Sequence, residues 1–412
     1  MKFSKLLVSS ALSLSLAFGT VSVYPAFAVE FADTSGIQSE SSINKLVSLG
    51  VFPNPGEAFN PDDDFTRYDF AIVANQIMSL KAGAKQVKFS DVGSKDKNYV
   101  SVLKMVNEGY LKPNKNSFGK NQGVTYAEFA RLLAHGLGLK KQWTNRPVDF
   151  LFYLDRKGVL DIDTDLDAVV TREAAAVAVD RFITLVGTFE SDSGIVAELY
   201  DGGFVYNNGS ENVKVKFAKN VSVFVSGQSS ANDAIVVGSP VEVVFNKKGE
   251  VAYAAGQLLD AEEGALKLTA GKWNIGTFVK DVNMDVVMMS LPNSPADPFT
   301  LTLFNSYQTA GAEFFGQAFF TENDEVTLVY PYIKKATANK DVTVTATSIT
   351  VAFSAALKQT FVVAEGAKVT LDGKDTTLAA LVELAGKGTN FSGNFEAGEN
   401  GQATSVTLVT KK

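Results

Sequence analysis

The sequence predicts a multidomain α plus β protein, with an N-terminal all-α three-repeat helical bundle followed by about three small all-β modules, each a sandwich or barrel-like. Up to about residue 187, apolar residues recur at the three- and four-residue spacing of one helix face. Beyond it they alternate with polar residues in short runs broken by Gly, Asn, Asp and Ser. Both halves also contain internal repeats. The change of period near Val186 and Gly187 therefore predicts the main domain boundary.

The first residues predict a secretory signal peptide over residues 1–28. Lys2 and Lys5 precede an apolar run over residues 6–18, and Ala26-Phe27-Ala28 gives the small-x-small pattern of a cleavage site. The alternative, a membrane helix, needs a longer apolar run than this one. We expect a mature chain that begins near Val29 and has no membrane span, because no later stretch is long and apolar enough.

Composition excludes several classes of function. The 412 residues contain no cysteine and one histidine, which argues against zinc sites and against Ser-His-acid or Cys-His catalysis. The net charge of −7 becomes −9 once Lys2 and Lys5 leave with the signal peptide, and an acidic chain without a basic block argues against nucleic acid and anionic lipid. A cysteine-free exported chain fits a Gram-positive-type bacterium.

The helical half consists of three similar units, expected at about 29–83, 84–141 and 142–187. Each begins with a short motif, continues into a helix that ends at Gly plus an apolar residue, and reaches a Thr that opens a second helix. The three motifs are Phe31-Ala-Asp33, Phe89-Ser-Asp91 and Pro147-Val-Asp149; the glycine pairs are Gly50-Val51, Gly109-Tyr110 and Gly158-Val159; the threonines are Thr66, Thr125 and Thr171. One helical hairpin cannot bury its own apolar face, so the three should pack together.

Capping explains most of this pattern. Thr66 and Thr125 can cap helix N-termini, with Asp69 and Glu128 completing capping boxes, whereas Ala174 takes that place in the third unit. Gly50, Gly109 and Gly158 suit helix C-termini, where φ is often positive.

Capping does not explain an arginine directly after the cap. Arg67 and Arg172 fall at helix N-termini, where the macrodipole disfavours a cation. An anion shared between the guanidinium and the exposed backbone N–H groups would account for them. The alternative is a solvated arginine in the first helical turn.

The second half predicts three β modules, at about 188–260, 261–334 and 335–412. Its closing strands resemble one another, at Glu250-Val-Ala-Tyr, Glu325-Val-Thr-Leu and Ser405-Val-Thr-Leu. Val225-Ser-Gly-Gln and Leu371-Asp-Gly-Lys predict matching hairpin turns. Three prolines, Pro292, Pro295 and Pro298, predict a loop in the middle module.

The helical half resembles the S-layer homology domain family. The resemblance rests on the Phe-x-Asp start, the helix ending in Gly-apolar, the Phe59-Asn60-Pro61 loop and the Thr-Arg-x-acid helix opening, and it covers about residues 31–187. It implies a pseudo-threefold bundle whose grooves bind secondary cell wall polymer, often through a pyruvylated sugar that meets the arginine. The site residues carried over by position are Asp33, Gly50, Arg67, Asp91, Gly109, Asp149, Gly158 and Arg172.

The units depart from the family pattern at several positions. The second has Tyr126 where the arginine should be, and the third opens with Pro147, lacks the Phe-x-Pro loop and is shortened. All three lack the tryptophan usual after the opening motif. We therefore expect at most two grooves to keep the charge, and a purely structural bundle is the alternative.

Acidic residues in the third unit alternate like those of a calcium loop. They run from Asp161 to Asp167, but Leu166 stands where an EF-hand needs Gly and Arg172 where it needs Glu. A solvated acidic loop is the preferred interpretation. Calcium binding here or at residues 62–64 is the alternative, and the family resemblance implies that calcium often orders surface arrays; no other metal or cofactor is expected.

The sequence thus predicts a non-enzymatic, secreted protein of the cell wall surface, held by its helical half to wall polymer. The β modules would make protein contacts, including self-association into a surface array through their open edges. Two alternatives remain: a wall-anchored enzyme acting on polysaccharide, which needs only two carboxylates, and a module that displays its β domains to ligands.

Overall fold

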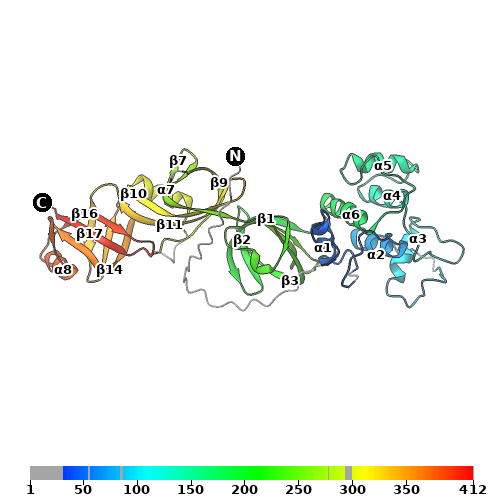
Figure 1. Cartoon of the computed structure of the whole chain (residues 1–412), viewed down its shortest axis with the longest axis horizontal. Coiled ribbons are helices and arrows are strands. Elements are labelled where there is room, and N and C mark those ends of the chain that lie inside the picture. Colours follow the sequence, from blue (N-terminus) through cyan, green and yellow to red (C-terminus); the bar gives the residue numbers. More distant parts are fainter. Residues whose placement is uncertain (1–30, 54–55, 84–86, 277, 293–298, 412) are drawn as a thin grey trace, which may run out of the picture.

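The structure, a computed structural model, describes residues 31–53, 56–83, 87–276, 278–292 and 299–411. The helices lie at one end of an elongated molecule, and three groups of strands follow them in a row toward the C-terminus (Figure 1). The change from helix to strand falls between Val186 and Ser191, so the predicted mixture of helices and β modules is confirmed. The predicted signal peptide, with Pro295 and Pro298 of the predicted loop, lies outside the described residues.

Six helices precede the first strand in the described part of the chain. They are α1 (Glu40–Ser48), α2 (Arg67–Ile77), α3 (Tyr99–Asn107), α4 (Tyr126–Gly136), α5 (Pro147–Asp155) and α6 (Arg172–Val186). α2 packs against α3, α4 against α5 and α6 against α1, so the second helix of each predicted unit contacts the first helix of another unit and the three units form a ring.

A triangle of backbone hydrogen bonds lies at the centre of this ring. Phe65 N–H donates to Val170 O over 2.8 Å, Val170 N–H to Val124 O over 2.9 Å, and Val124 N–H to Phe65 O over 2.9 Å. All three side chains are fully buried. Since each of these residues stands one position before a helix-capping threonine, the triangle brings the N-termini of α2, α4 and α6 together.

The predicted helix caps are confirmed. The Oγ1 atoms of Thr66, Thr125 and Thr171 accept the backbone N–H three residues on, over 3.1, 3.4 and 3.2 Å. Asp69 and Glu128, however, direct their carboxylates to arginines of neighbouring helices rather than back to the cap. The capping-box interpretation is therefore right for the threonine and wrong for the acid.

The first group of strands forms a closed barrel with one short extra strand. Its strands are β1 (Ser191–Tyr200), β2 (Gly203–Asn207), β3 (Asn212–Val225), β4 (Gln228–Ser230), β5 (Pro240–Phe245) and β6 (Val251–Gly256). The order is β2-β1-β5-β6-β3, and pairing of β2 with β3 closes the ring. β3 and β6 run parallel, whereas the other pairs are antiparallel.

The other two groups repeat this topology. The second consists of β7 (Asp260–Thr269), β8 (Lys272–Ile275), β9 (Phe278–Met288), β10 (Ala312–Phe320) and β11 (Val326–Ala336), with α7 (Leu301–Thr309) before β10. The third consists of β12 (Lys340–Val344), β13 (Ser348–Ala352), β14 (Lys358–Leu371), β15 (Lys374–Asp375), β16 (Phe391–Ala397) and β17 (Ala403–Thr410), with α8 (Leu378–Gly386) before β16. In each barrel the strands follow one another around the ring in the order second, first, fourth, fifth, third, and the third strand pairs with the second to close it. The third and fifth strands run parallel in both barrels.

Five strands in this order form a Greek-key barrel of the OB-fold type. The three all-β modules are thus barrels and not sandwiches. Ring closure also corrects the expectation of open edges, because within the described strands only β4 and β15 pair on one side alone. The predicted hairpin turns are confirmed: Ser226-Gly227 and Asp372-Gly373 all have positive φ, from 48° to 78°, before β4 and β15.

Part of the first barrel packs into the hydrophobic core of the helical part. Phe224 of β3 and Tyr253 of β6 belong to the same buried cluster as Ile43 of α1. Two hydrogen bonds reinforce the contact, between the hydroxyls of Ser41 and Tyr253 over 2.7 Å and between those of Ser48 and Ser222 over 2.6 Å. The interior of the first barrel forms a cluster of its own, so the predicted boundary separates two cores that are joined by this packed interface.

Candidate functional site

Asp91 holds the loop that precedes α4. Its carboxylate accepts the backbone N–H groups of Phe118, Gly119 and Lys120 over 2.7 to 2.8 Å, and the hydroxyl of Ser117 over 3.0 Å. Burial by itself raises the pKa of Asp91, but these hydrogen bonds to the charged form outweigh it and lower the pKa to about 2. The predicted site residue is therefore a structural clamp on a loop.

Asp33 does the same for the loop before α2. Its two carboxylate oxygens accept the N–H of Phe59 over 2.9 Å and the N–H of Asn60 over 2.6 Å. Burial raises its pKa, and these hydrogen bonds, helped by the charge of Arg172, lower it overall. Asp149 of the third unit clamps no such loop and instead pairs with Arg146, over 2.7 Å on the exposed surface.

The Asp91 clamp predicts a pH dependence. Because its folded pKa of about 2 lies below the unfolded value of 3.8, its contribution is fully present above pH 4 and is lost as the pH falls from about 3.8 through 2. The shift corresponds to roughly 2 kcal/mol of unfolding free energy. Urea unfolding followed by circular dichroism should show Asp91→Asn less stable than the unsubstituted protein at pH 6. The difference should shrink at pH 2.5, and a difference independent of pH would contradict the assignment.

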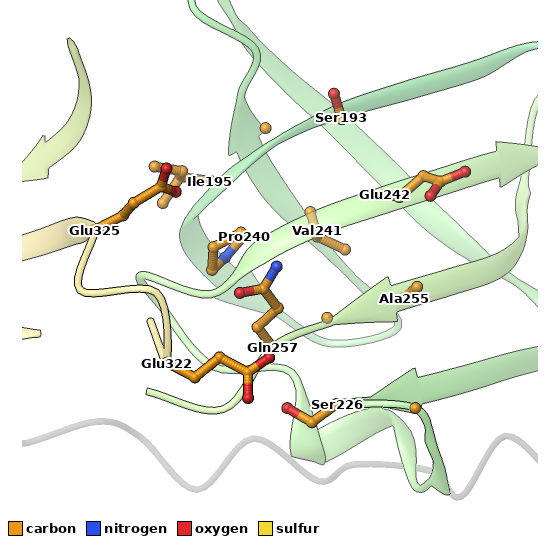
Figure 2. A pocket seen from close by; sticks show the side chains of 13 residues that line it. Ser193, Ile195, Ser226, Pro240, Val241, Glu242, Ala255, Gln257, Glu322 and Glu325 are labelled. Atoms are coloured by element: carbon orange, nitrogen blue, oxygen red, sulfur yellow. The ribbon is translucent and has the colours of Figure 1, made fainter. Parts of the chain in front are cut away.

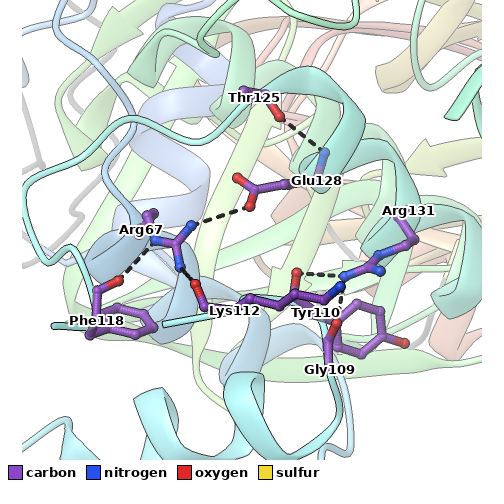
Figure 3. A network of polar contacts seen from close by, with 8 residues as sticks. All are labelled: Arg67, Gly109, Tyr110, Lys112, Phe118, Thr125, Glu128 and Arg131. Carbon is purple, nitrogen blue, oxygen red and sulfur yellow. Dashed lines mark hydrogen bonds and ion pairs between the residues drawn. The ribbon is translucent and has the colours of Figure 1, made fainter. Parts of the chain in front are cut away.

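Arg67 lies buried between α2 and the elements of the next unit, with 8% of its surface exposed (Figure 3). Its Nε donates to Phe118 O over 3.0 Å and its Nη2 to Lys112 O over 2.7 Å. Its Nη1 forms an ion pair with Glu128 over 3.2 Å. This guanidinium already has protein partners on all three nitrogens.

Arg172 is placed in the same way and is also 8% exposed. Its Nε donates to Phe59 O over 2.8 Å, its Nη1 pairs with Asp69 over 3.2 Å, and its guanidinium lies 4.6 Å from the centre of the Phe59 ring. Its Nη2 is buried without a partner among the described residues, and it is also closed off from solvent. Arg172 thus binds the loop that Asp33 holds, and Arg67 binds the loop that Asp91 holds.

Tyr126 occupies the third equivalent position. Arg67 N–H bonds to Gln122 O, Arg172 N–H to Asp63 O and Tyr126 N–H to Ala168 O, each joining a helix start to the loop of the next unit. We call Arg67, Tyr126 and Arg172 the post-cap residues, since each follows a capping threonine.

A groove of about 280 Å³ lies at the Tyr126 position. Its polar lining comes from Tyr126, Asp161, Thr164, Glu173 and Arg181. Its other lining residues are Val159, Leu160, Thr171, Ala174, Val177 and Ala178. The sequence shows the missing arginine of the second unit and the missing Phe-x-Pro loop of the third, and from the first we expected a groove without the charge; it did not predict an opening here.

The three predicted glycines end the first helix of each unit. Gly50, Gly109 and Gly158 have φ of 70°, 75° and 68°, as a left-handed C-terminal position requires. A Cβ on any of them would meet nothing within 4 Å, so only the backbone conformation requires glycine. The carbonyl of Gly109 also accepts the guanidinium of Arg131 over 2.6 Å (Figure 3).

A second hollow, of about 530 Å³, lies between the first and second barrels (Figure 2). Carboxylates of Glu242, Glu322 and Glu325 line it with Gln257 and Ser226. Within the described residues, no three acidic or histidine side chains are grouped closely enough to hold a metal ion. The described part of the chain also contains no helix long and apolar enough to cross a membrane.

Comparison with known families places part of the helical region. Residues 30–71 match the model of the S-layer homology domain, a stretch that contains α1, the start of α2 and the predicted site residues Asp33, Gly50 and Arg67. A comparison with curated proteins gives no match.

Proposed function

Because the chain carries an S-layer homology domain, which indicates association with the cell wall, we propose that the protein is a structural anchor that binds secondary cell wall polymer through its helical part. We interpret the ring of six helices as three repeats of one bundle. Support comes from the triangle of backbone bonds and from the matching position of the three post-cap residues. The match over residues 30–71 carries the proposal, and the open polar groove elsewhere in the same helical part, between Tyr126 and residues 159–181, supports it.

The three barrels serve in this proposal to extend the protein away from the wall. Figure 1 shows them in a single row beyond the helices. Closed barrels offer few strand edges for pairing, so contacts within an array would have to use side-chain surfaces. Barrels of this topology bind oligosaccharides in other proteins, which favours display of ligand-binding modules as the second candidate function.

The anchoring proposal predicts that the mature protein sediments with cell wall sacculi. Residues 29–412 should pellet with untreated sacculi, and should stay in solution after hydrofluoric acid has stripped the secondary polymer. Mild acid that removes only pyruvyl groups should have the same effect if the acidic sugar is the ligand. Protein that stays soluble with untreated sacculi would show that the anchoring proposal is wrong.

A further inference from the structure

We infer that the polymer site is the groove beside Tyr126, and that the two positions with an arginine are closed by that arginine. The inference rests on the proposed function for the identity of the polymer, but its location comes from the geometry alone. It assigns the ligand to Tyr126, Asp161, Thr164, Glu173 and Arg181, none of which the sequence analysis predicts as a site residue.

Two large side chains fill each closed position. At the Arg172 position the guanidinium stacks on Phe59, and at the Arg67 position it lies 5.4 Å from the centre of the Phe118 ring. Both phenylalanines and both arginines are at least nine-tenths buried. A ligand could contact the Arg67 guanidinium only by displacing a carbonyl or a carboxylate that already binds it. At the Arg172 position Nη2 has no partner among the described residues, but it is closed off from solvent.

Both of these side chains are replaced at the third position. Phe59 and Phe118 stand seven residues before Thr66 and Thr125, and the residue seven before Thr171 is Thr164. Thr164 is much smaller than phenylalanine, and Tyr126 cannot make the carbonyl and carboxylate contacts of an arginine. The groove is the space that these two replacements leave, which explains why it lies here.

The groove offers the contacts that an acidic sugar needs. Arg181 is exposed, and its guanidinium donates a long hydrogen bond of 3.5 Å to Val159 O. Among the described residues it has no carboxylate partner, so its guanidinium can bind the carboxylate of a ligand. Asp161 and Glu173 can accept sugar hydroxyls. Tyr126 supplies a ring face and a hydroxyl, and burial raises its pKa, so the hydroxyl stays protonated.

Size limits the ligand to a short one. A groove of about 280 Å³ is slightly smaller than most small-molecule sites, which suits one sugar unit at the end of a chain and not an extended polysaccharide. We therefore assign the groove to a terminal sugar that carries one carboxylate.

The test uses Tyr126→Arg, for which the two hypotheses predict opposite results. If the groove is the site, an arginine there fills it, and the affinity for wall polysaccharide released by hydrofluoric acid should fall at least tenfold by titration calorimetry. If the post-cap arginines bind the ligand, the same substitution should strengthen binding. Thr164→Phe, which restores the other missing side chain, should also weaken binding, and circular dichroism checks that each variant is folded.

Arg181→Ala tests the charge contact, with Arg156→Ala as its control because Arg156 is an exposed arginine outside the groove. The first should lose at least tenfold in affinity, and the second should bind like the unsubstituted protein. Suppose that the unsubstituted protein pellets with sacculi and that Arg181→Ala and Tyr126→Arg bind normally. The groove assignment would then be wrong, and the anchoring proposal would still stand. If the unsubstituted protein binds neither sacculi nor polysaccharide, the proposed function fails and the groove assignment with it.

Discussion

Replacing Arg67 with alanine is expected to lower the unfolding free energy of the mature protein by about 3 kcal/mol or more, because it breaks a buried ion pair and leaves its partners behind. Glu128 would lose its cation, and the carbonyls of Phe118 and Lys112 would lose their donors. Unpaired polar groups of this kind cost more than the original bonds contribute. The midpoint of urea unfolding, followed at 222 nm to weight the helices, measures the change.

Arg146→Ala is the matched control for Arg67→Ala. Arg146 also pairs with an aspartate, but its side chain is 76% exposed, and surface ion pairs contribute little. It should leave the unfolding midpoint unchanged. If Arg67→Ala unfolds at the same urea concentration as Arg146→Ala, the arginine is not the structural element that its contacts indicate.

This prediction changes how a loss of wall binding should be interpreted. The Thr-Arg pair in the sequence suggests a ligand contact, and removal of Arg67 could indeed abolish sedimentation with sacculi. Because the arginine joins α2 to the loop before α4, that loss would come with a loss of helix stability. A binding defect without any stability defect is expected only from residues of the groove, such as Arg181.

Features within a few residues of one another could be predicted from the sequence. The helix caps at Thr66 and Thr125, the left-handed glycines and the two hairpin turns all depend on local geometry, and each is found where its residue type predicts it. The switch from helices to strands follows from the period of apolar residues alone.

Features that depend on distant segments could not be predicted. The partners of Arg67 lie 45 to 61 residues away in the sequence, so the pattern shows an unexplained cation but not what binds it. Closure of the barrels requires the parallel pairing of β3 with β6, for which the alternation of residues carries no signal. The packing of the first barrel against α1 is hidden for the same reason.

The centre of the helical ring explains why one side chain should matter more than its equivalents. Phe65 contributes to the backbone triangle with Val124 and Val170, but it is the only aromatic residue of the three. Its ring stacks with Phe52 at a centroid distance of 5.5 Å and meets Phe70 and Phe129 edge-on at 5.9 and 6.0 Å. It therefore joins residues from the first and second units around one point.

Phe65→Ala is expected to destabilise the protein by about 4 kcal/mol, since it removes a fully buried ring and leaves a cavity that the surrounding rings cannot close. Val124→Ala, at the equivalent backbone position, should cost only about 2 kcal/mol, because fewer buried carbons are lost. Phe152→Ala removes a phenylalanine that is 53% exposed and should have little effect. Urea unfolding of the three variants should rank their losses of stability in this order. Equal losses for Phe65→Ala and Val124→Ala would show that the ring of helices does not depend on the aromatic cluster at its centre.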